Sequence, residues 1–225
     1  MINKNIFVAC DVSTQKEIIE LLKLVHEDIA GIKIGLQYIT QRSPDDILEL
    51  LKFNKPIFYD AKFLDIKNTL VESVKSLKKL RISYATVHLL NGLESLKAAN
   101  AAAAEINIKL LGVSVLTSFD DNDLLKLGFK HNVKDQVLRL IEIANEANLY
   151  GVICSPHEIK IIKSIAPNLK CFTPGIRIDN SKDDQKRTMT PKEAIQAGSD
   201  YLIIGRPITA GDPKKNIQNI ISSIS

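Results

Sequence analysis

The sequence contains few aromatic residues, few cysteines and no long apolar run. Aromatic residues make up 5% of the chain and are not interleaved with lysines and arginines, so there is no platform on which single-stranded nucleic acid could stack. No apolar run approaches the roughly 18 residues that are needed to cross a bilayer. We therefore expect neither nucleic acid nor a membrane as a partner.

The three cysteines, Cys10, Cys154 and Cys171, are an odd number, lack the spacing of a metal site and lie in apolar, strand-like segments. This pattern predicts buried free thiols in a cytoplasmic protein. At the N-terminus, an apolar stretch too short for a secretory signal is followed at once by Asp11. We therefore expect no secretory segment.

Charge is nearly balanced, with 30 Lys and Arg residues against 26 Asp and Glu residues. The resulting net charge of +4 is spread along the chain and forms no basic block. Such a distribution favours a small anionic ligand over a nucleic-acid track.

Short runs rich in valine and isoleucine alternate with longer amphipathic stretches, which is typical of repeated βαβ units and a parallel sheet. Eight strands close a barrel, and the chain length suits one such unit. The sequence therefore predicts an α/β fold, a single (β/α)8 TIM barrel over residues 1–225. The expected strands lie near residues 5–10, 30–35, 56–61, 83–88, 108–115, 149–154, 169–173 and 200–205.

Helices are predicted between these strands by apolar residues at helical spacing, such as Ile18, Leu21 and Val25. Asp212 followed by Pro213 predicts the start of the last helix. An open, doubly wound sheet would show a similar alternation. The barrel is favoured because polar residues fall at the carboxyl ends of the strands, where barrels build their sites. These residues are Asp11, Lys33, Asp60, Lys62, Thr117, Pro174 and Arg206.

An Asp-x-Lys-x-x-Asp motif ends the third strand, with Asp60, Lys62 and Asp65 as its charged residues. In a regular strand Asp60 and Lys62 point to the same side, because side chains alternate with a period of two. The chain then turns and brings Asp65 to the start of the next helix. The alternative is an ordinary ion pair, with Asp65 as N-cap of a helix that begins at Ile66.

Lys33 lies in an apolar setting near the end of the second strand, where a cation needs a partner because burial disfavours its charged form. Asp60 on the adjacent strand is the obvious candidate. A Lys–Asp–Lys–Asp array would then comprise Lys33, Asp60, Lys62 and Asp65. Alternatively, Lys33 lies at a strand edge and reaches solvent.

A phosphate site is predicted after the last two strands. Thr173 to Arg177 open a long polar loop containing Gln185, which is long enough to act as a lid. Gly205 and Arg206 follow the eighth strand. Loops at these positions usually bind phosphate in barrels. A glycine lets the backbone come close to the anion, and an arginine binds it through the paired N–H donors of its guanidinium group. The alternative for Arg206 is a surface salt bridge.

The four histidines show no metal-binding spacing, so no metal is expected. His88, near the end of the fourth strand, faces the mouth of the barrel by position, and we expect a packed, hydrogen-bonded role for it.

Taken together, these motifs resemble the orotidine 5'-phosphate decarboxylase family, over the whole chain and in the same order. Leu64 and Lys67 depart from the His and Pro that are usual in the family, and Asn91-Gly92 replaces a pair of glycines. The resemblance rests on Asp11, Lys33, Asp60-x-Lys62-x-x-Asp65-Ile66 with Asn68-Thr69, Leu116-Thr117-Ser118, Thr173 to Arg177, Gln185 and Gly205-Arg206.

The resemblance implies decarboxylation of orotidylate to uridylate without a cofactor, in the last step of UMP synthesis. Lys62 would protonate C6 of the pyrimidine, and Asp60 would crowd the substrate carboxylate. Lys33 and Asp65 would complete the array, with Asp65 donated across the interface of a homodimer. The substrate-binding residues would be Asp11 and Lys33 at the ribose, Thr117 at the pyrimidine, Gln185, Gly205, Arg206 and Arg177 at the phosphate, and Ile66, Thr69 and Pro174.

Two other functions compete with this one. Sugar-phosphate lyases of the same superfamily share Asp-x-Lys-x-x-Asp but use Mg2+, with an acidic ligand at the position of Lys33, and a cation there argues against them. A non-catalytic phosphate-binding barrel is the second alternative. It would not need an array of charges that is costly to bury.

Overall fold

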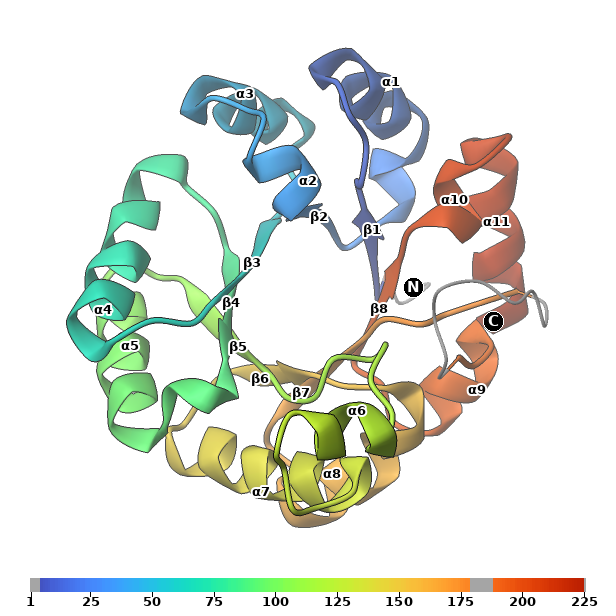
Figure 1. Cartoon of the computed structure of the whole chain (residues 1–225). Helices are drawn as coiled ribbons and strands as arrows, with labels where there is room; N and C mark the ends of the chain where they lie inside the picture. Colours follow the sequence, from blue (N-terminus) through green and yellow to red (C-terminus); the bar gives the residue numbers. More distant parts are fainter. Residues whose placement is uncertain (1–4, 179–187, 225) are drawn as a thin grey trace.

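The computed structural model describes residues 5–178 and 188–224. Eight parallel strands, each hydrogen-bonded to its sequence neighbours, close into a barrel in which β8 pairs with β1 (Figure 1). The predicted (β/α)8 barrel is therefore confirmed, and the open, doubly wound sheet is excluded. The strands are β1 Ile6–Ala9, β2 Gly31–Gly35, β3 Ile57–Phe63, β4 Tyr84–His88, β5 Lys109–Val113, β6 Gly151–Ile153, β7 Lys170–Thr173 and β8 Tyr201–Ile204.

Helices surround the barrel as an outer layer, with α2 and α6 toward its mouth in the view of Figure 1. They are α1 Gln15–Val25, α2 Leu36–Ile39, α3 Pro44–Glu49, α4 Lys67–Ser76, α5 Leu93–Glu105, α6 Asp121–Lys126, α7 Val133–Glu146, α8 Ile159–Ile165, α9 Pro191–Gln196, α10 Arg206–Thr209 and α11 Pro213–Ile224. Short 3-10 turns are η1 His26–Asp28, η2 Leu50–Phe53, η3 Leu77–Leu80, η4 Leu89–Asn91 and η5 Pro156–Glu158.

Side-chain caps explain where several helices begin. In α1, Thr14 accepts from the Glu17 N–H while the Glu17 carboxylate accepts from the Thr14 N–H, a reciprocal capping box. The expected cap of α11 is confirmed, since Asp212 Oδ1 accepts from the Lys215 N–H at 3.1 Å. Such caps satisfy N–H groups that have no partner within the helix.

Alternation along the strands divides the core into two parts. On β1, Ile6 and Val8 pack outward against the helices, whereas Phe7 and Ala9 point into the barrel. Aromatic rings fill the barrel toward the amino ends of the strands. The Phe7 ring centroid lies 5.4 Å from that of Tyr84 and 5.5 Å from that of Phe172. A ligand site is therefore expected toward the carboxyl ends of the strands.

The three cysteines are free and buried in the outer part of the core, as predicted. Burial raises the pKa of Cys10 to about 12, so its thiol stays protonated at neutral pH.

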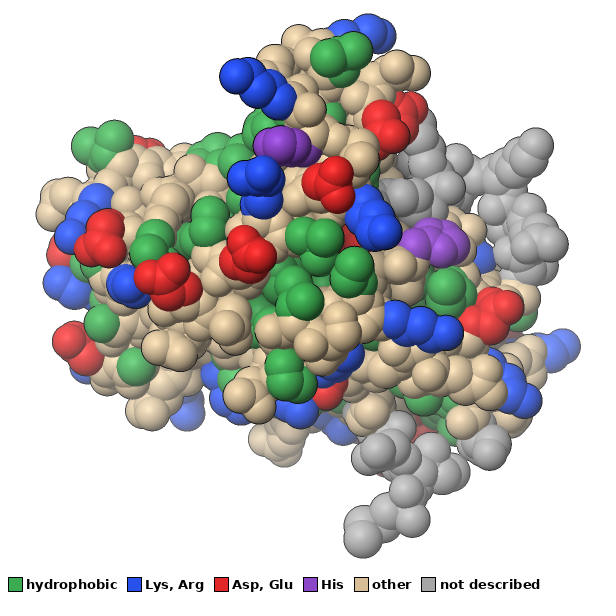
Figure 2. Space-filling view, turned by 90° about the horizontal axis from the view of Figure 1, so that it is seen from below, with side chains coloured by type: hydrophobic (Ala, Val, Ile, Leu, Met, Phe, Trp, Pro, Cys, Tyr) green, Lys and Arg blue, Asp and Glu red, His purple; other side chains and the backbone are tan. Residues whose placement is uncertain are grey.

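On the face shown in Figure 2, acidic and basic side chains are interspersed and no continuous basic stripe appears. None of the helices in the described part of the chain is both long and apolar enough to span a membrane.

Candidate active site

A pocket of about 560 Å³ opens at the carboxyl ends of the strands. This volume lies within the range of small-molecule sites. Its walls include nine of the residues singled out from the sequence, contributed by strand ends and loops all around the barrel. They are Asp11, Lys33, Asp60, Lys62, Thr117, Pro174, Arg177, Gly205 and Arg206.

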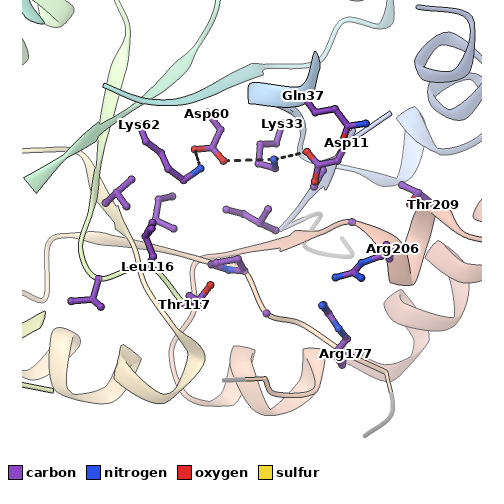
Figure 3. A pocket seen from close by; sticks show the side chains of 18 residues that line it. Asp11, Lys33, Gln37, Asp60, Lys62, Leu116, Thr117, Arg177, Arg206 and Thr209 are labelled. Atoms are coloured by element: carbon purple, nitrogen blue, oxygen red, sulfur yellow. Dashed lines mark hydrogen bonds and ion pairs between the residues drawn. The ribbon is translucent and has the colours of Figure 1, made fainter. Parts of the chain in front are cut away.

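Four charged side chains form a row along one wall of this pocket (Figure 3). Lys33 Nζ lies 3.1 Å from Asp11 Oδ1 and 3.6 Å from Asp60 Oδ2. Lys62 Nζ lies 2.9 Å from Asp60 Oδ1. The row therefore alternates in sign, and the expected pairing of Lys33 with Asp60 is present. Lys33 is buried, so the alternative in which it reaches solvent is wrong.

The strand register explains why these groups meet. Lys33 pairs with Ala9 on β1 and with Phe58 on β3, and both of these neighbours point into the barrel. Asp60 follows Phe58 by two residues and pairs with Gly35. A Cβ at Gly35 would lie only 3.0 Å from Asp11 Oδ1 and 3.1 Å from Lys33 Nζ. Glycine at this position thus leaves room for the Asp11–Lys33 pair.

The charges of the row determine its protonation. Burial would raise the pKa of Asp60, but the positive charges of Lys33 and Lys62 outweigh burial and hold that pKa below its usual value. Burial would likewise lower the pKa of Lys33, but Asp60 and Asp11 outweigh it and raise that pKa. Asp60 is therefore a carboxylate and Lys33 an ammonium at neutral pH.

The end of β3 is irregular where it carries Lys62. Its register against β4 shifts between Tyr59 and Phe63, and Lys62 has a left-handed backbone with φ of 52°. The regular alternation expected from the sequence is therefore interrupted, although Asp60 and Lys62 still meet. The Lys62 N–H donates to Thr86 Oγ1 at 2.8 Å, and Thr86 Oγ1 donates to Asp60 Oδ1 at 3.0 Å.

Asp65, Ile66 and Thr69 are exposed and do not line the pocket of their own chain. The helix α4 begins at Lys67 with Ile66 as its N-cap, and no side chain caps it. The alternative in which Asp65 caps this helix is therefore wrong. Instead, Asp65 Oδ1 accepts from the N–H of Ile66 at 2.7 Å.

Asn91, at the end of η4, holds the segment that carries Asp65. Its Nδ2 donates to the carbonyl oxygens of Phe63, at 2.8 Å, and His88, at 2.7 Å. Its Oδ1 accepts from the Asp65 N–H at 3.1 Å. All three contacts use backbone groups, so the amide of Asn91 fixes the path of the chain between β3 and α4.

The opposite end of the pocket is basic. Arg177 and Arg206 point toward one another there (Figure 3). Arg177 is buried and donates from Nη1 to the Ile176 carbonyl oxygen at 2.8 Å. A Cβ at Gly205 would make only ordinary contacts, the shortest 3.5 Å to Ala9 Cβ, so packing of this chain does not by itself require glycine. Gln185 lies outside the described residues.

Gln37 and Thr209 also line the pocket but were not singled out from the sequence. Gln37 follows β2 in α2, and its Nε2 donates to Ser13 Oγ at 3.3 Å. Only its position just after a strand end could have suggested a role. Apolar walls are formed by Val113, Val115, Ile153 and Ile203.

His88 is half-buried, and its Nδ1 accepts from the Leu90 N–H at 3.3 Å, which confirms the expected packed, hydrogen-bonded role. Burial, together with the charge of Lys62, lowers the pKa of His88. Within residues 5–178 and 188–224, no group of three or more His, Cys, Asp or Glu side chains is arranged to hold a metal ion.

Comparison with known proteins reveals similarity over nearly the whole chain. Residues 4–220 match the profile described as "Orotidine 5'-phosphate decarboxylase / HUMPS family". A protein of Wolbachia pipientis named orotidine 5'-phosphate decarboxylase is 38% identical over 98% of both chains. One of Idiomarina loihiensis with the same name is 39% identical over 97% of both. The crystal structure of the Lactobacillus acidophilus enzyme of that name is 32% identical, with a TM-score of 0.86 over 99% of both chains.

Proposed function

Since the chain belongs to the orotidine 5'-phosphate decarboxylase / HUMPS family, we propose that it is the carboxy-lyase that converts orotidine 5'-phosphate to uridine 5'-phosphate and CO2. This reaction is the last step of de novo UMP synthesis. The observation that carries the proposal is the Asp60 carboxylate, which lies between the ammonium groups of Lys33 and Lys62 in the wall of a pocket with a basic far end.

The reaction requires a positive charge in this wall, close to C6 of the pyrimidine. When the bond between C6 and the carboxylate carbon breaks, its electron pair stays on C6, and the ring offers no ordinary electron sink. A preorganised ammonium stabilises that developing charge and can then transfer a proton to it. We assign this role to Lys62, which ends the step neutral and regains its proton from water. The step needs no oxidant or reductant, and we assign it no cofactor.

Asp60 has two roles in this proposal. Its carboxylate holds Lys62 Nζ at 2.9 Å, and its negative charge repels the substrate carboxylate, a repulsion that ends when CO2 leaves. Its lowered pKa keeps it charged while the substrate binds. Lys33 holds the other carboxylate oxygen and, with Asp11, is available to the ribose hydroxyls.

The remaining pocket residues fit a nucleotide monophosphate. We assign the phosphate to Arg206, with Arg177 beside it and the open backbone of Gly205 admitting the anion. Thr117 and Pro174 lie on the wall assigned to the pyrimidine. We further assign Gln185 to the phosphate on the basis of the resemblance alone. Binding energy from the distant phosphate can be used to order the site for reaction.

We also propose a homodimer in which Asp65 completes the charge array of the partner subunit, together with Ile66 and Thr69. Three large apolar side chains lie in or next to this segment, with exposed fractions of 55% for Leu64, 73% for Ile66 and 46% for Leu90. A second copy covering this surface would remove them from water.

A metal-dependent sugar-phosphate lyase is less well supported, because Lys33 forms ion pairs with two carboxylates at the position where such an enzyme needs an acidic ligand. The three free thiols support a cytoplasmic location.

The test follows the absorbance of orotidylate and the formation of uridylate with purified protein. We expect conversion by the wild type, in EDTA as well as without it. We expect loss of activity by many orders of magnitude in Lys62→Ala, since each ~1.4 kcal/mol of barrier is tenfold in rate. Lys16→Ala is the matched control, because Lys16 is exposed in an i,i+4 surface pair and should keep full activity. A wild type that fails to convert orotidylate would overturn the proposal.

A further inference from the structure

Thr86 is a fully buried polar residue beside the pocket to which the proposed reaction assigns no role. It lies on β4 and pairs with Leu111 of β5, which points into the barrel. It is not among the residues that line the pocket. Both of its hydrogen bonds go to residues of the charge row, namely the Lys62 N–H at 2.8 Å and Asp60 Oδ1 at 3.0 Å.

The register of β3 against β4 explains why a hydroxyl is needed here. Tyr59 pairs with Ala85, and the next pair is Phe63 with Val87. Three residues of β3, from Asp60 to Lys62, therefore lie opposite a single residue of β4, which is Thr86. A bulge of this kind leaves backbone groups without ladder partners. Thr86 supplies the missing acceptor for the N–H of Lys62.

The bulge also puts Lys62 into a conformation that is costly for a residue with a side chain. Its φ of 52° lies in the left-handed region, which persists only where surrounding contacts hold it. The hydrogen bond from Lys62 N–H to Thr86 is such a contact, and it lies at the base of the side chain whose ammonium faces the pocket. A shift of the backbone here would move Lys62 Nζ relative to any bound substrate.

The direction of the second hydrogen bond is fixed by chemistry. The Thr86 hydroxyl has one proton, and the carboxylate of Asp60 can only accept, so Oγ1 donates to Asp60 and accepts from Lys62. Asp60 Oδ1 thus receives donors from both Thr86 and Lys62 Nζ. Two donors on one oxygen fix the orientation of the carboxylate plane.

We propose that Thr86 is a positioning residue that holds the Asp60 carboxylate and the Lys62 backbone in one geometry. The inference rests on the function proposed above and adds a residue to the same site. A hydroxyl is the required group at this position, because valine fills nearly the same volume but leaves the Lys62 N–H without an acceptor and Asp60 with one donor fewer.

The test compares Thr86→Val and Thr86→Ala, which lose the hydroxyl, with Thr86→Ser, which keeps it. We expect kcat to fall about 10- to 100-fold in the first two variants with little change in KM, and Thr86→Ser to stay within about threefold of wild type. Ser199→Ala is the matched control, since it removes a buried hydroxyl that bonds to Thr173 Oγ1 and the Tyr201 carbonyl. It should lower stability without lowering kcat.

Two readouts separate positioning from stability. Loss of a donor to Asp60 should move the acid limb of the kcat–pH profile to higher pH in Thr86→Val but not in Thr86→Ser. Exchange of the Lys62 amide hydrogen with solvent, followed by NMR, should be at least about tenfold faster in Thr86→Val than in wild type and Thr86→Ser.

Unchanged kcat in Thr86→Val and Thr86→Ala, or an equal loss in Thr86→Ser, would overturn the proposal. If the wild type did not convert orotidylate, the proposed function would fail on its own. The exchange measurement uses no substrate, so it would still decide whether Thr86 holds the Lys62 backbone. Equally slow exchange of the Lys62 amide in all variants would show that it does not.

Discussion

Lys33 Nζ on β2 and Asp11 Oδ1 in the loop after β1 lie 3.1 Å apart, and this contact joins a buried cation to a carboxylate that is half exposed at the mouth of the barrel. The same ammonium also serves Asp60 on its other side, at 3.6 Å. One cation therefore neutralises two acids, Asp60 on β3 and Asp11 in the loop after β1. Its removal would leave the buried Asp60 with Lys62 as its remaining cation in this row.

Lys33→Met should destabilise the protein by about 2–4 kcal/mol at pH 7, because it leaves a buried carboxylate partly uncompensated. Urea unfolding followed by circular dichroism measures this difference. The control is Lys52→Met, which removes an exposed lysine paired with Glu49 and should change the stability by less than about 1 kcal/mol. A Lys33→Met protein as stable as wild type would show that Asp60 does not depend on this cation.

The difference in stability between wild type and Lys33→Met should depend on pH. The lowered pKa of Asp60 contributes stability that is present above the unfolded-state pKa of about 3.9 and is lost as pH falls through the folded-state pKa. Without Lys33 the folded-state pKa of Asp60 rises, so less stability remains to be lost. Lys33 itself stays charged in this range, since its pKa is raised. The difference between the two proteins should therefore narrow as pH falls from 7 to below about 4, and a constant difference would contradict this assignment.

Asn91→Ala should lower kcat/KM about 10- to 100-fold, because the segment carrying Asp65 loses the amide that bonds to its Phe63 carbonyl and its Asp65 N–H and ties them to the His88 carbonyl of β4. Asn100→Ala is the matched control. The Nδ2 of Asn100 also donates to two backbone carbonyls, those of Ala147 and Asn148, on the outside of the barrel. It should reduce stability by a similar amount and leave kcat/KM unchanged. Equal kinetic effects of the two variants would mean that Asn91 acts on stability alone.

The fold and most of the charged wall could be predicted from the sequence, because strand ends in a parallel barrel converge on one mouth whatever the details of packing. The contact between Lys33 and Asp60 could be predicted because both residues lie on adjacent strands at positions that point into the barrel. The row differs from the expected array in one member: within one chain its fourth charge is Asp11. Asp65 lies outside the pocket of its own chain.

Thr86 and Asn91 were missed for a different reason. Thr86 acts on a bulge of β3 and Asn91 on the backbone that follows this bulge, and a bulge depends on the register between two strands, which the sequence of β3 alone does not reveal. One signal was present for Thr86: it is a polar residue at an inward position, two residues before His88 and two after Tyr84. Asn91 stood out only as a departure from paired glycines, without a reason for the amide.

If Asp65 acts in the partner's site, mixing inactive Lys62→Ala and Asp65→Ala proteins should restore activity. A mixed dimer has one site with both lesions and one with neither. Random exchange makes about half of the dimers mixed, so about one quarter of the wild-type activity per subunit should return. The measurement is orotidylate turnover after subunit exchange has been demonstrated by mass spectrometry. No recovery after exchange would place Asp65 in its own chain's site or outside any site.

Arg206→Ala should reduce kcat/KM for orotidylate by about 30- to 1000-fold, because it removes a charge-assisted, forked contact worth about 2–4 kcal/mol to a phosphate. Arg139→Ala is the matched control, since Arg139 is exposed on α7 and should leave turnover unchanged. Steady-state kinetics on the three proteins measures both effects.

The decisive comparison for Arg206 uses orotidine, which lacks the phosphate. Arg206 lines the end of the pocket away from Lys62, so its proposed contact to the phosphate is lost when orotidine replaces orotidylate (Figure 3). Wild type and Arg206→Ala should therefore decarboxylate orotidine at similar, low rates. A mutation that slows both substrates equally would act through the fold or the chemistry, and the assignment of Arg206 to the phosphate would then be wrong. A loss confined to orotidylate would instead identify the phosphate as the group that Arg206 binds.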